Sequence, residues 1–486
     1  MTDSAVRVPG HGRKRDRSYY LGAASVILGG VLVHLTLGTI YTFGNMNPYF
    51  TSYIRAYSSP RDLTYTSSIW VSAFAGAGQG LAMFAGGILA SRIGPRWAVL
   101  LGSWTTSLGV VLTYLTIKVS LQLSVITYGA MFGLGIGIAY APPLAVAMQW
   151  LPERKGLVNG IVLAGFGGGS FIFNQVQTAY INPDNLAPDQ PGSPGSTTKY
   201  FSKEKAGDLL DRVPKTFLIL GTCYALMQFI GVLLIRPPPS DARNDRERDI
   251  LVTPSNMAPD SLDDPLINSD KDSFSSQISD CSPLGVADVS LHPMEVLKSR
   301  SFYLLWATFL FNGQAITFIS TLYKAYGQTF IEDDHFLALL GSFSSVFNAI
   351  GRIFWGSLGD RISFRTTMLI LCGVMASLLL TLNATPSGGK PMFFIWISAI
   401  FLTFCGNFAL FPTVTARTFG PKYISVNFGL VFTSQVITCL LGAFLTSNLQ
   451  SIIGWNGMFF LVAAFTYTGM FFTFLFDVKD GRGNDI

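Results

Sequence analysis

Long apolar runs separated by short polar segments occupy most of the chain. Each run is about 20 residues or longer, the length at which an apolar helix crosses a bilayer. The runs form two groups, at 20–47, 67–90, 97–117, 122–149, 157–180 and 214–236, and at 300–327, 336–357, 366–385, 392–415, 425–447 and 457–477. The pattern predicts an all-α polytopic membrane protein with twelve transmembrane helices in two six-helix bundles.

Polar segments before, between and after the two groups define the predicted domains. Residues 1–19 form an N-terminal tail and residues 478–486 a C-terminal tail, on either side of the bundles 20–236 and 299–477. The segment 237–298 between the bundles starts with three prolines and continues with serines and charged residues. This composition is typical of a disordered linker.

Two ten-residue loops at the ends of apolar runs have nearly the same sequence. Segments 87–96 and 356–365 both start with glycine and place arginine at the sixth and tenth positions, at an offset of 269 residues (356 − 87). Such a fixed long offset indicates a duplicated membrane domain with two pseudo-symmetric bundles. Positive-inside anchoring alone would explain the arginines but not the matched glycines.

The charged side chains of these loops are expected to bind helix C-terminal carbonyls or acidic residues and so to latch one conformation. These candidate conformational residues are Arg92, Arg96, Asp360, Arg361 and Arg365. The first loop has Ser91 where the second has Asp360, so we expect the second latch to be the stronger one.

Composition excludes most classes of soluble protein and enzyme. Hydrophobic residues make up 49% of the chain and charged residues 13%, against about 25% charged in soluble domains. The net charge of +5 is spread over short loops and forms no basic patch for nucleic acid. The five cysteines lack metal-ligand spacing, and no nucleophile–base pair or phosphate loop is found. We therefore expect no catalytic residue, no metal site and no cofactor.

Lysines and arginines in the short loops predict the orientation in the bilayer. With the N-terminus inside, the cytoplasmic segments hold Arg13, Lys14, Arg15, Arg17, Arg92, Arg96, Arg154, Lys155, Arg361, Arg365, Arg417 and Lys422. The short outer loops hold fewer basic residues, such as Arg55, Arg61, Lys118 and Lys390. By the positive-inside rule both termini and the linker face the cytoplasm, in the plasma membrane or an organelle membrane.

The repeated loop resembles the signature loop of the major facilitator superfamily, and the resemblance covers essentially the whole chain. Further motifs resemble its oxalate/formate-antiporter-like and monocarboxylate-transporter branch: Gly133-x-Gly135-x-Gly137-x-x-Tyr140-x-Pro142, the segments 150–156, 159–160 and 164–170, and the segments 38–44, 407–412 and 427–433. The glycine spacing allows helices to approach closely, and we expect Pro142 and Pro143 to break the fourth helix near mid-membrane.

The resemblance implies a secondary active transporter that moves a small organic anion, most simply a monocarboxylate, by alternating access. Arg352 in the eighth run falls at the position of the family's substrate-binding arginine. A guanidinium in a spanning helix is costly unless it faces a wet cavity or a partner, and its planar fork suits a carboxylate. The alternative is that Arg352 snorkels to the cytoplasmic face. The expected walls of the site are Tyr41, Asn45, Trp70, Tyr140, Asn348, Asn407 and Gln435.

Three of these positions depart from the family's patterns. Monocarboxylate–proton symporters tend to have an aspartate where this chain has Asn348 and a lysine in the first helix where it has Asn45. Oxalate exchangers have a lysine in the eleventh helix where this chain has Gln435. The site is therefore expected to contain one cationic side chain, which suits a monoanionic substrate. The coupled ion is expected to be either a proton or a counter-anion.

Other polar residues in the apolar runs allow two interpretations each. His34 either titrates near neutral pH or is hydrogen-bonded in helix packing, and we expect packing. Tyr323 and Lys324 near the outer end of the seventh run are expected to be interface anchors and not an outer gate. Two other functions stay open: a carrier of the same fold for a neutral or zwitterionic solute, and a non-transporting sensor or scaffold.

Overall fold

The computed structural model describes residues 17–151, 155–192, 198–239, 290–420 and 423–479. Most of the predicted tails (1–19 and 478–486) and of the predicted linker (237–298) lies outside these residues, but residues 237–239 and 290–298 of the linker are described. Within the described part of the chain the structure is helical apart from loops and one two-stranded hairpin.

Helices of the first half follow the predicted runs, except that the first helical stretch continues to Tyr57 beyond the run 20–47 and the last helix begins at Lys203, before the run 214–236. They are α1 (Arg17–Leu37), η1 (Gly38–Thr42), α2 (Phe43–Tyr57), α3 (Ile69–Ile93), α4 (Pro95–Thr116), α5 (Leu121–Ser124), the π-helical η2 (Val125–Met131), α6 (Phe132–Trp150), α7 (Lys155–Ile181) and α8 (Lys203–Leu234). Between α7 and α8 the strands β1 (Gln190–Pro191) and β2 (Lys199–Tyr200) pair in antiparallel orientation.

The first helix of the second half, at residues 293–296, lies inside the predicted linker 237–298. The helices of this half are α10 (Pro293–Val296), α11 (Arg300–Gly327), α12 (Asp334–Arg361), α13 (Phe364–Thr381), η4 (Leu382–Ala384), α14 (Thr385–Phe419), α15 (Ile424–Phe432) and α16 (Ser434–Phe474).

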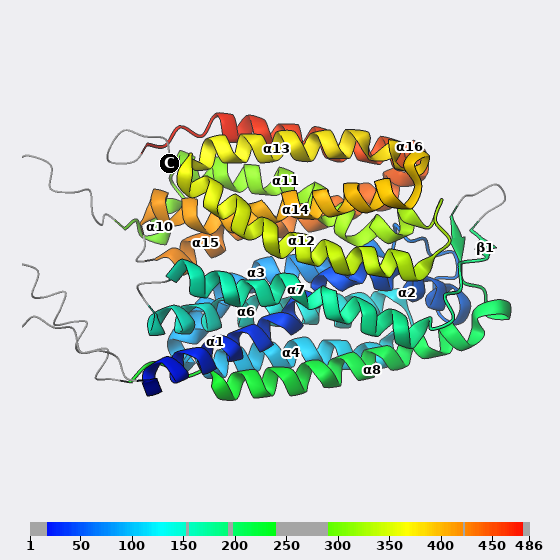
Figure 1. The fold of residues 1–486 in the computed structure, drawn as a ribbon, viewed down its shortest axis with the longest axis horizontal. Helices are drawn as coiled ribbons and strands as arrows, with labels where there is room; N and C mark the ends of the chain where they lie inside the picture. Colours follow the sequence, from blue (N-terminus) through cyan, green and yellow to red (C-terminus); the bar gives the residue numbers. More distant parts are fainter. Residues whose placement is uncertain (1–16, 152–154, 193–197, 240–289, 421–422, 480–486) are drawn as a thin grey trace, which may run out of the picture.

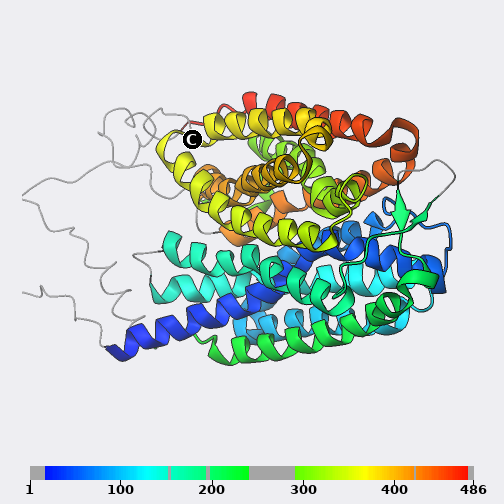
Figure 2. The ribbon, with the colours of Figure 1, turned by 45° about the vertical axis from the view of Figure 1, so that its right-hand side comes forward.

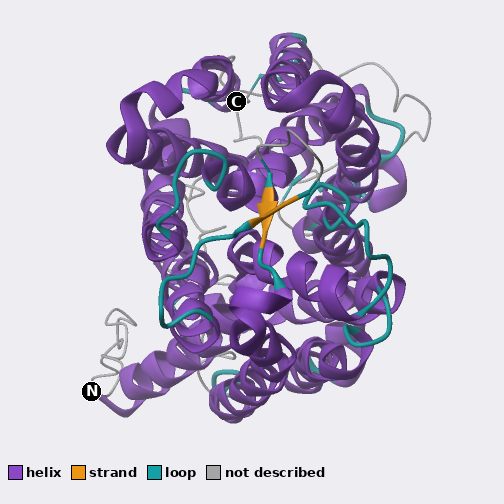
Figure 3. Ribbon diagram, turned by 90° about the vertical axis from the view of Figure 1, so that its right-hand side faces the viewer, coloured by secondary structure: helices purple, strands orange, loops and turns teal. Residues whose placement is uncertain are grey.

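The two halves of the chain form two helical bundles that lie side by side (Figures 1 and 2). The start of α1 and the ends of α8 and α16 lie together at one end of the molecule, called here the termini end (Figure 1). The β1–β2 hairpin lies at the opposite end, called here the hairpin end. A view onto the hairpin end shows the two strands over the middle of the molecule, where the bundles meet (Figure 3).

Nine helical stretches among the described residues are long and apolar enough to cross a membrane. The two longest, Phe364–Phe419 with 56 residues and Val426–Phe474 with 49, exceed the length of two crossings at about 20 residues each. In the latter, Gly454 has a non-helical backbone (φ 67°, ψ −173°) that divides α16. The all-α polytopic prediction is confirmed, and the count of twelve crossings stays a prediction.

The outer surface of the bundles carries large apolar side chains. Trp104, Leu226, Ile353, Phe444 and Phe471 are each at least half exposed. An apolar surface of this kind is unfavourable in water and suits the hydrocarbon region of a bilayer. The chain is therefore a multi-pass membrane protein.

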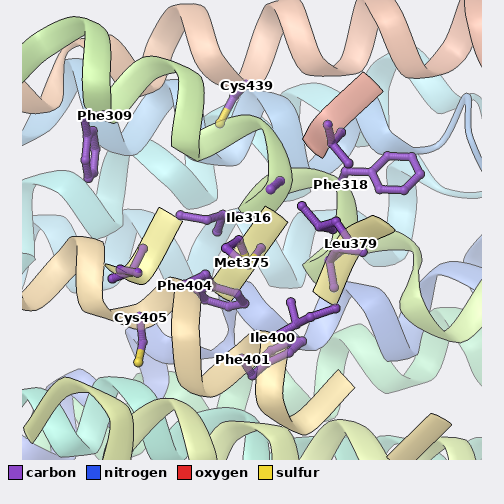
Figure 4. Packing of buried hydrophobic residues seen from close by; sticks show 14 of the residues in the cluster. Phe309, Ile316, Phe318, Met375, Leu379, Ile400, Phe401, Phe404, Cys405 and Cys439 are labelled. Atoms are coloured by element: carbon purple, nitrogen blue, oxygen red, sulfur yellow. The ribbon is translucent and has the colours of Figure 1, made fainter. Parts of the chain in front are cut away.

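Each half has its own hydrophobic core, and α3 contributes to both. Val71 and Ala75 belong to the core of the first half, whereas Ile69 and Ala73 belong to the core of the second. Figure 4 shows part of the second core, in which the rings of Phe401 and Phe404 lie 4.8 Å apart between their centroids. The face of α3 that meets the second half is therefore part of the contact between the bundles.

The glycine run of the fourth predicted helix lies on α6, in contact with two neighbouring helices. A Cβ on Gly133 would overlap the backbone oxygen of Ala75 in α3, and one on Gly135 would overlap Thr106 in α4. The absence of a side chain therefore allows α6 to approach both helices at backbone distance.

The expectation that Pro142 and Pro143 break this helix is wrong. The helix α6 continues through both prolines to Trp150. Each proline removes only one N–H donor, and neighbouring helices shield the freed backbone in a membrane bundle, so the helix tolerates the pair.

Candidate functional site

A cavity of about 200 Å³ lies between the two halves. Its walls come from η1, α3, α6 and α7 of the first half and from α11, α12, α14, α15 and α16 of the second. It follows α6 from Tyr140 to Met148 and includes Ile424 at the start of α15, so it leads toward the termini end. The lining is mainly apolar, with these polar members: Tyr41, Ser72, Gln79, Tyr140, Thr317, Ser320, Thr321, Arg352 and Gln435.

Arg352 on α12 supplies the charge of this lining. Arg352 is 9% exposed, and its Nε donates a hydrogen bond of 3.1 Å to Oδ1 of Asn348, one turn earlier on the helix. The terminal nitrogens Nη1 and Nη2 are buried and make no hydrogen bond of ordinary geometry within the described part of the chain. Because the guanidinium is enclosed in the cavity wall, the alternative that it snorkels to the cytoplasmic face is wrong. Two N–H-bearing nitrogens on a planar fork, with no acidic partner among the described residues, are the arrangement that binds a carboxylate.

Aromatic rings surround the guanidinium. Its Cζ lies 5.6 Å from the ring centroid of Phe166 and 5.4 Å from that of Phe408, within the range of cation–π attraction. The hydroxyls of Tyr41 and Tyr140 also interact electrostatically with it. Rings on several sides hold the guanidinium in place and limit the water around it.

Gln435 also lies in the cavity wall, on α16. Its Nε2 donates to Sγ of Cys439 at 3.3 Å, and its Oε1 is buried without a hydrogen bond from the described residues. A second unsatisfied polar group in the same cavity as Arg352 gives a ligand a further hydrogen-bonding position.

Four of the predicted wall residues lie outside the cavity lining. Asn348 accepts the hydrogen bond from Nε of Arg352 and does not itself line the cavity. Asn407 is buried and donates to the carbonyl of Phe404. Trp70 is half-buried and packs against the core of the second half. Asn45 belongs to a separate cluster nearer the hairpin end, described below. Its side-chain amide forms hydrogen bonds with residues of neighbouring helices.

His34 also lies outside the lining. Its Nδ1 is 2.9 Å from the carbonyl oxygen of Gly30, one turn earlier, and its ring lies 5.3 Å from that of Tyr140 between centroids. These contacts are those expected for a histidine in helix packing.

A buried ion pair lies at the hairpin end. Nζ of Lys324 on α11 is 2.9 Å from Oδ1 of Asp334 on α12, and both side chains are 0% exposed. The expectation that Lys324 is an interface anchor is therefore wrong, since its ammonium is enclosed by protein. Moving two charges out of water costs several kcal/mol per ion, so their other hydrogen bonds must be well satisfied.

Side chains of the first half satisfy those remaining hydrogen bonds. Lys324 donates to Oδ1 of Asn45 at 2.9 Å and to the hydroxyl of Tyr49 at 3.1 Å. Tyr49 in turn donates to Oδ2 of Asp334, which also accepts a 3.0 Å hydrogen bond from Nδ2 of Asn182. These five residues form the hairpin-end cluster. The cluster joins the two halves near the hairpin end.

Sequence reasoning missed the cluster for an identifiable reason. Asp334 falls in the gap between the predicted runs 300–327 and 336–357, and Lys324 is expected to be an interface anchor. The usable signal was the segment of α2, where Asn45 and Tyr49 lie one turn apart at the end of the first apolar run. Two such groups at helical spacing can face a charge on a neighbouring helix.

Asp333, next to the cluster, has a different environment. Its carboxylate accepts from Nζ of Lys390 at 2.6 Å and from the backbone N–H of Phe336, and about a third of the side chain is exposed. The hydrogen bond from Lys390 is the main cause that lowers the pKa of Asp333 to about 2. Asp333 is thus the N-cap of α12, which leaves Asp334 inside the helix.

The two repeated loops bind helix ends at the termini end. Arg96 donates to the carbonyl oxygens of Val232, Leu233 and Ile235 at the end of α8. Arg365 donates to the carbonyl oxygen of Phe474 at the end of α16 at 2.7 Å. Each tenth-position arginine thus contacts the last helix of its own half, where unpaired carbonyls attract a cation.

The fifth positions of the loops differ. Oδ1 of Asp360 lies 2.8 Å from Nη2 of Arg417 on α14, with both side chains exposed, whereas Ser91 donates to the carbonyl oxygen of Ile88 in its own helix. Arg92 and Arg361 are exposed. The ion pair of the second loop joins two helices of one half.

Comparison with known proteins identifies relatives along most of the chain. The family model described as Major Facilitator Superfamily matches residues 26–443 and, again, residues 305–485. Apicoplast pyruvate carrier 1 of Toxoplasma gondii is 32% identical over 483 residues, which cover 91% of this chain and 86% of that protein. The oxalate:formate antiporter of Oxalobacter formigenes is 24% identical over 78% of this chain and 74% of its own.

A solved structure shows a similar fold. The xylose transporter XylE from E. coli, in a partially occluded inward open conformation, superposes with a TM-score of 0.64 over 96% of this chain and 100% of its own, at 13% identity. At that identity the likeness concerns the fold alone. The matches as a group lie among transporters and not among enzymes.

Proposed function

The chain belongs to the major facilitator superfamily, and we propose that it is a secondary active transporter of a small monocarboxylate that works by alternating access. The cavity between the halves is its substrate site. The hairpin-end cluster closes one side while the cavity leads to the other, as one state of such a cycle requires.

The observation that carries the proposal is the state of Arg352. Its two terminal nitrogens are buried in the cavity wall, and no acidic side chain among the described residues pairs with them. A buried cation without a counter-ion is unfavourable, and a single carboxylate removes that cost. One uncompensated positive charge therefore favours a monoanion over a neutral solute and over a dianion.

The relatives' names support the same chemical class. Proteins named for pyruvate and for oxalate and formate carry carboxylates, and they match most of this chain. Pyruvate is the first substrate to test, because it combines one carboxylate with a small body that the cavity can enclose.

The orientation of the chain is part of the proposal. The termini end holds the arginine-rich loops, so the positive-inside rule assigns it to the cytoplasm, in the plasma membrane or an organelle membrane. The structure then corresponds to an inward-facing state, with the hairpin end on the outer side.

Counterflow of labelled pyruvate in proteoliposomes tests the proposal. Wild-type protein is expected to exchange external label for internal pyruvate. Arg352→Ala and Arg352→Lys are expected to lower that exchange at least about tenfold, because neither offers the bidentate fork. Arg300→Ala, at the exposed start of α11, is the matched control and should exchange like wild type. Wild-type exchange by both Arg352 variants would contradict the role of the guanidinium, and exchange of neutral solutes that carboxylates do not inhibit would favour the alternative carrier.

A further inference from the structure

Asp334 is the one buried acidic side chain in the part of the chain that the structure describes. We propose that its carboxylate is the binding site for a co-transported proton, loaded from the hairpin end and released toward the cavity. The inference rests on the proposed function, to which it adds the coupled ion. It gives a role to the Lys324–Asp334 pair, which takes no part in substrate binding at Arg352.

Each donor to the Asp334 carboxylate comes from a definite half of the molecule. Lys324 and Gln328 belong to the second half, as Asp334 itself does, whereas Tyr49 and Asn182 belong to the first. When the bundles separate at the hairpin end, Tyr49 and Asn182 must leave, and the carboxylate meets outside water with two of its four donors gone. A carboxylate that loses donors binds a proton more readily.

Four other ionisable residues lie near Asp334. Tyr323 on α11 and Tyr65 before α3 interact electrostatically with it from neighbouring elements. Asp333 and His335 adjoin it in sequence, but Asp333 bonds to Lys390 and His335 to the carbonyl of Asn182. Lys324 is therefore the cation directly in contact with the carboxylate.

A proton on Asp334 also changes what Lys324 can bind. Thr317, Ser320 and Thr321 line the cavity on α11, and Lys324 lies one turn further along the same face. Once Asp334 is neutral, the Lys324 ammonium has no counter-ion within the pair and can attract a substrate carboxylate entering from outside. The proton adds one positive charge and the carboxylate one negative charge, so the combined step is electroneutral.

Closure of the hairpin end reverses the loading. Tyr49 and Asn182 again donate to the carboxylate and Lys324 again pairs with it, which favours the ionised form. The proton then leaves toward the cavity, whose wall begins one turn away at Ser320 and Thr321. The substrate passes to Arg352, and both are released at the termini end.

Asp334→Asn and Asp333→Asn are a matched pair for testing this site, since the same substitution is made at adjacent positions. Proteoliposomes are assayed for pyruvate counterflow and for pyruvate accumulation driven by an outside-acid pH gradient, with an internal pH dye reporting proton entry. Wild type and Asp333→Asn are expected to show all three signals. Asp334→Asn should keep counterflow within about threefold, while gradient-driven accumulation and proton entry fall at least about tenfold.

The outcomes separate this inference from the proposed function. Absence of wild-type counterflow contradicts the proposed function itself. Wild-type counterflow that ignores the gradient, or gradient-driven accumulation by Asp334→Asn, overturns the proton site alone. Where Asp334→Asn is unstable because Lys324 is left unpaired, the neutral double variant Lys324→Gln/Asp334→Asn takes its place. Loss of counterflow in both variants would make the pair structural and overturn the inference.

Discussion

Arg352 and Asn348 lie one turn apart on α12, and Nε of the arginine donates to Oδ1 of the asparagine at 3.1 Å. This neutral partner fixes the guanidinium without taking up its charge. The two terminal nitrogens are left for a ligand, which is the arrangement expected of a site for one carboxylate.

Asn348→Asp should therefore weaken substrate binding. An aspartate at this position places a permanent carboxylate beside the guanidinium, which competes with the substrate. We expect the KM for pyruvate to rise about tenfold near neutral pH, equivalent to about 1.4 kcal/mol. Because protonation removes the competing charge, the KM of this variant should fall as the pH is lowered. Asn348→Ala, which adds no charge, is the control, and an Asn348→Asp variant with the wild-type KM would contradict the account.

Arg352 could be singled out from the sequence because it falls at the position of the family's substrate-binding arginine and because a cation in a long apolar run is costly. The hairpin-end cluster could not, because its parts come from four separate segments. Asp334 illustrates the difficulty: in the sequence it belongs to an acidic triplet that is typical of a loop. In the structure Asp333 takes the N-cap position, so Asp334 begins the helix and points among Lys324, Tyr49 and Asn182.

The helical pattern was easier to predict than the contents of the cavity. Apolar length fixes where helices lie, and the bounds of α11 (Arg300–Gly327) match the run 300–327. Which polar side chains face the cavity depends on the rotation of each helix against its neighbours. Asn45 and Tyr41 are one turn apart, yet Asn45 bonds to Lys324 while Tyr41 lines the cavity.

Gly133→Ala should destabilise the first half. A methyl group at this position would overlap the backbone oxygen of Ala75, so α6 and α3 must separate. Overpacking of this kind costs about 1–3 kcal/mol, and a lower melting temperature in detergent should report it. Gly168→Ala in α7 is the matched control, because no atom lies within 4 Å of the added Cβ. Equal melting temperatures of the two variants would contradict close packing at Gly133.

The pair between Asp333 and Lys390 predicts a pH dependence of stability. The pKa of Asp333 is lowered from 3.8 to about 2 in the folded protein, so its contribution is present above about pH 3.8 and is lost as the pH falls toward 2. Because the pair is partly exposed, the contribution should be below about 1 kcal/mol. The melting temperature of Asp333→Asn relative to wild type should not change between pH 5 and 8. A difference that varies across that range would contradict the assignment.

Arg96→Ala should loosen the end of α8. The guanidinium donates to three of its last carbonyl oxygens, and losing a charged cap at a helix C-terminus costs about 1 kcal/mol. A lower melting temperature is expected, with partial recovery in Arg96→Lys. Arg92→Ala, at an exposed position of the same loop, should melt like wild type. An unchanged melting temperature for Arg96→Ala would show that the α8 cap is not a stabilising contact.

Ser91→Asp tests whether the two repeated loops are unequal latches. In the second loop, Asp360 pairs with Arg417 on α14, while Ser91 bonds only to its own helix through Ile88. An aspartate at position 91 adds an acceptor at the corresponding place, which should stabilise one conformation, raise the melting temperature and slow transport. Since the pair in the second half is exposed, the gain in stability should stay below about 1 kcal/mol and shrink in high salt. Asp360→Asn should act in the opposite direction, and an unchanged transport rate and melting temperature in Ser91→Asp would contradict the latch.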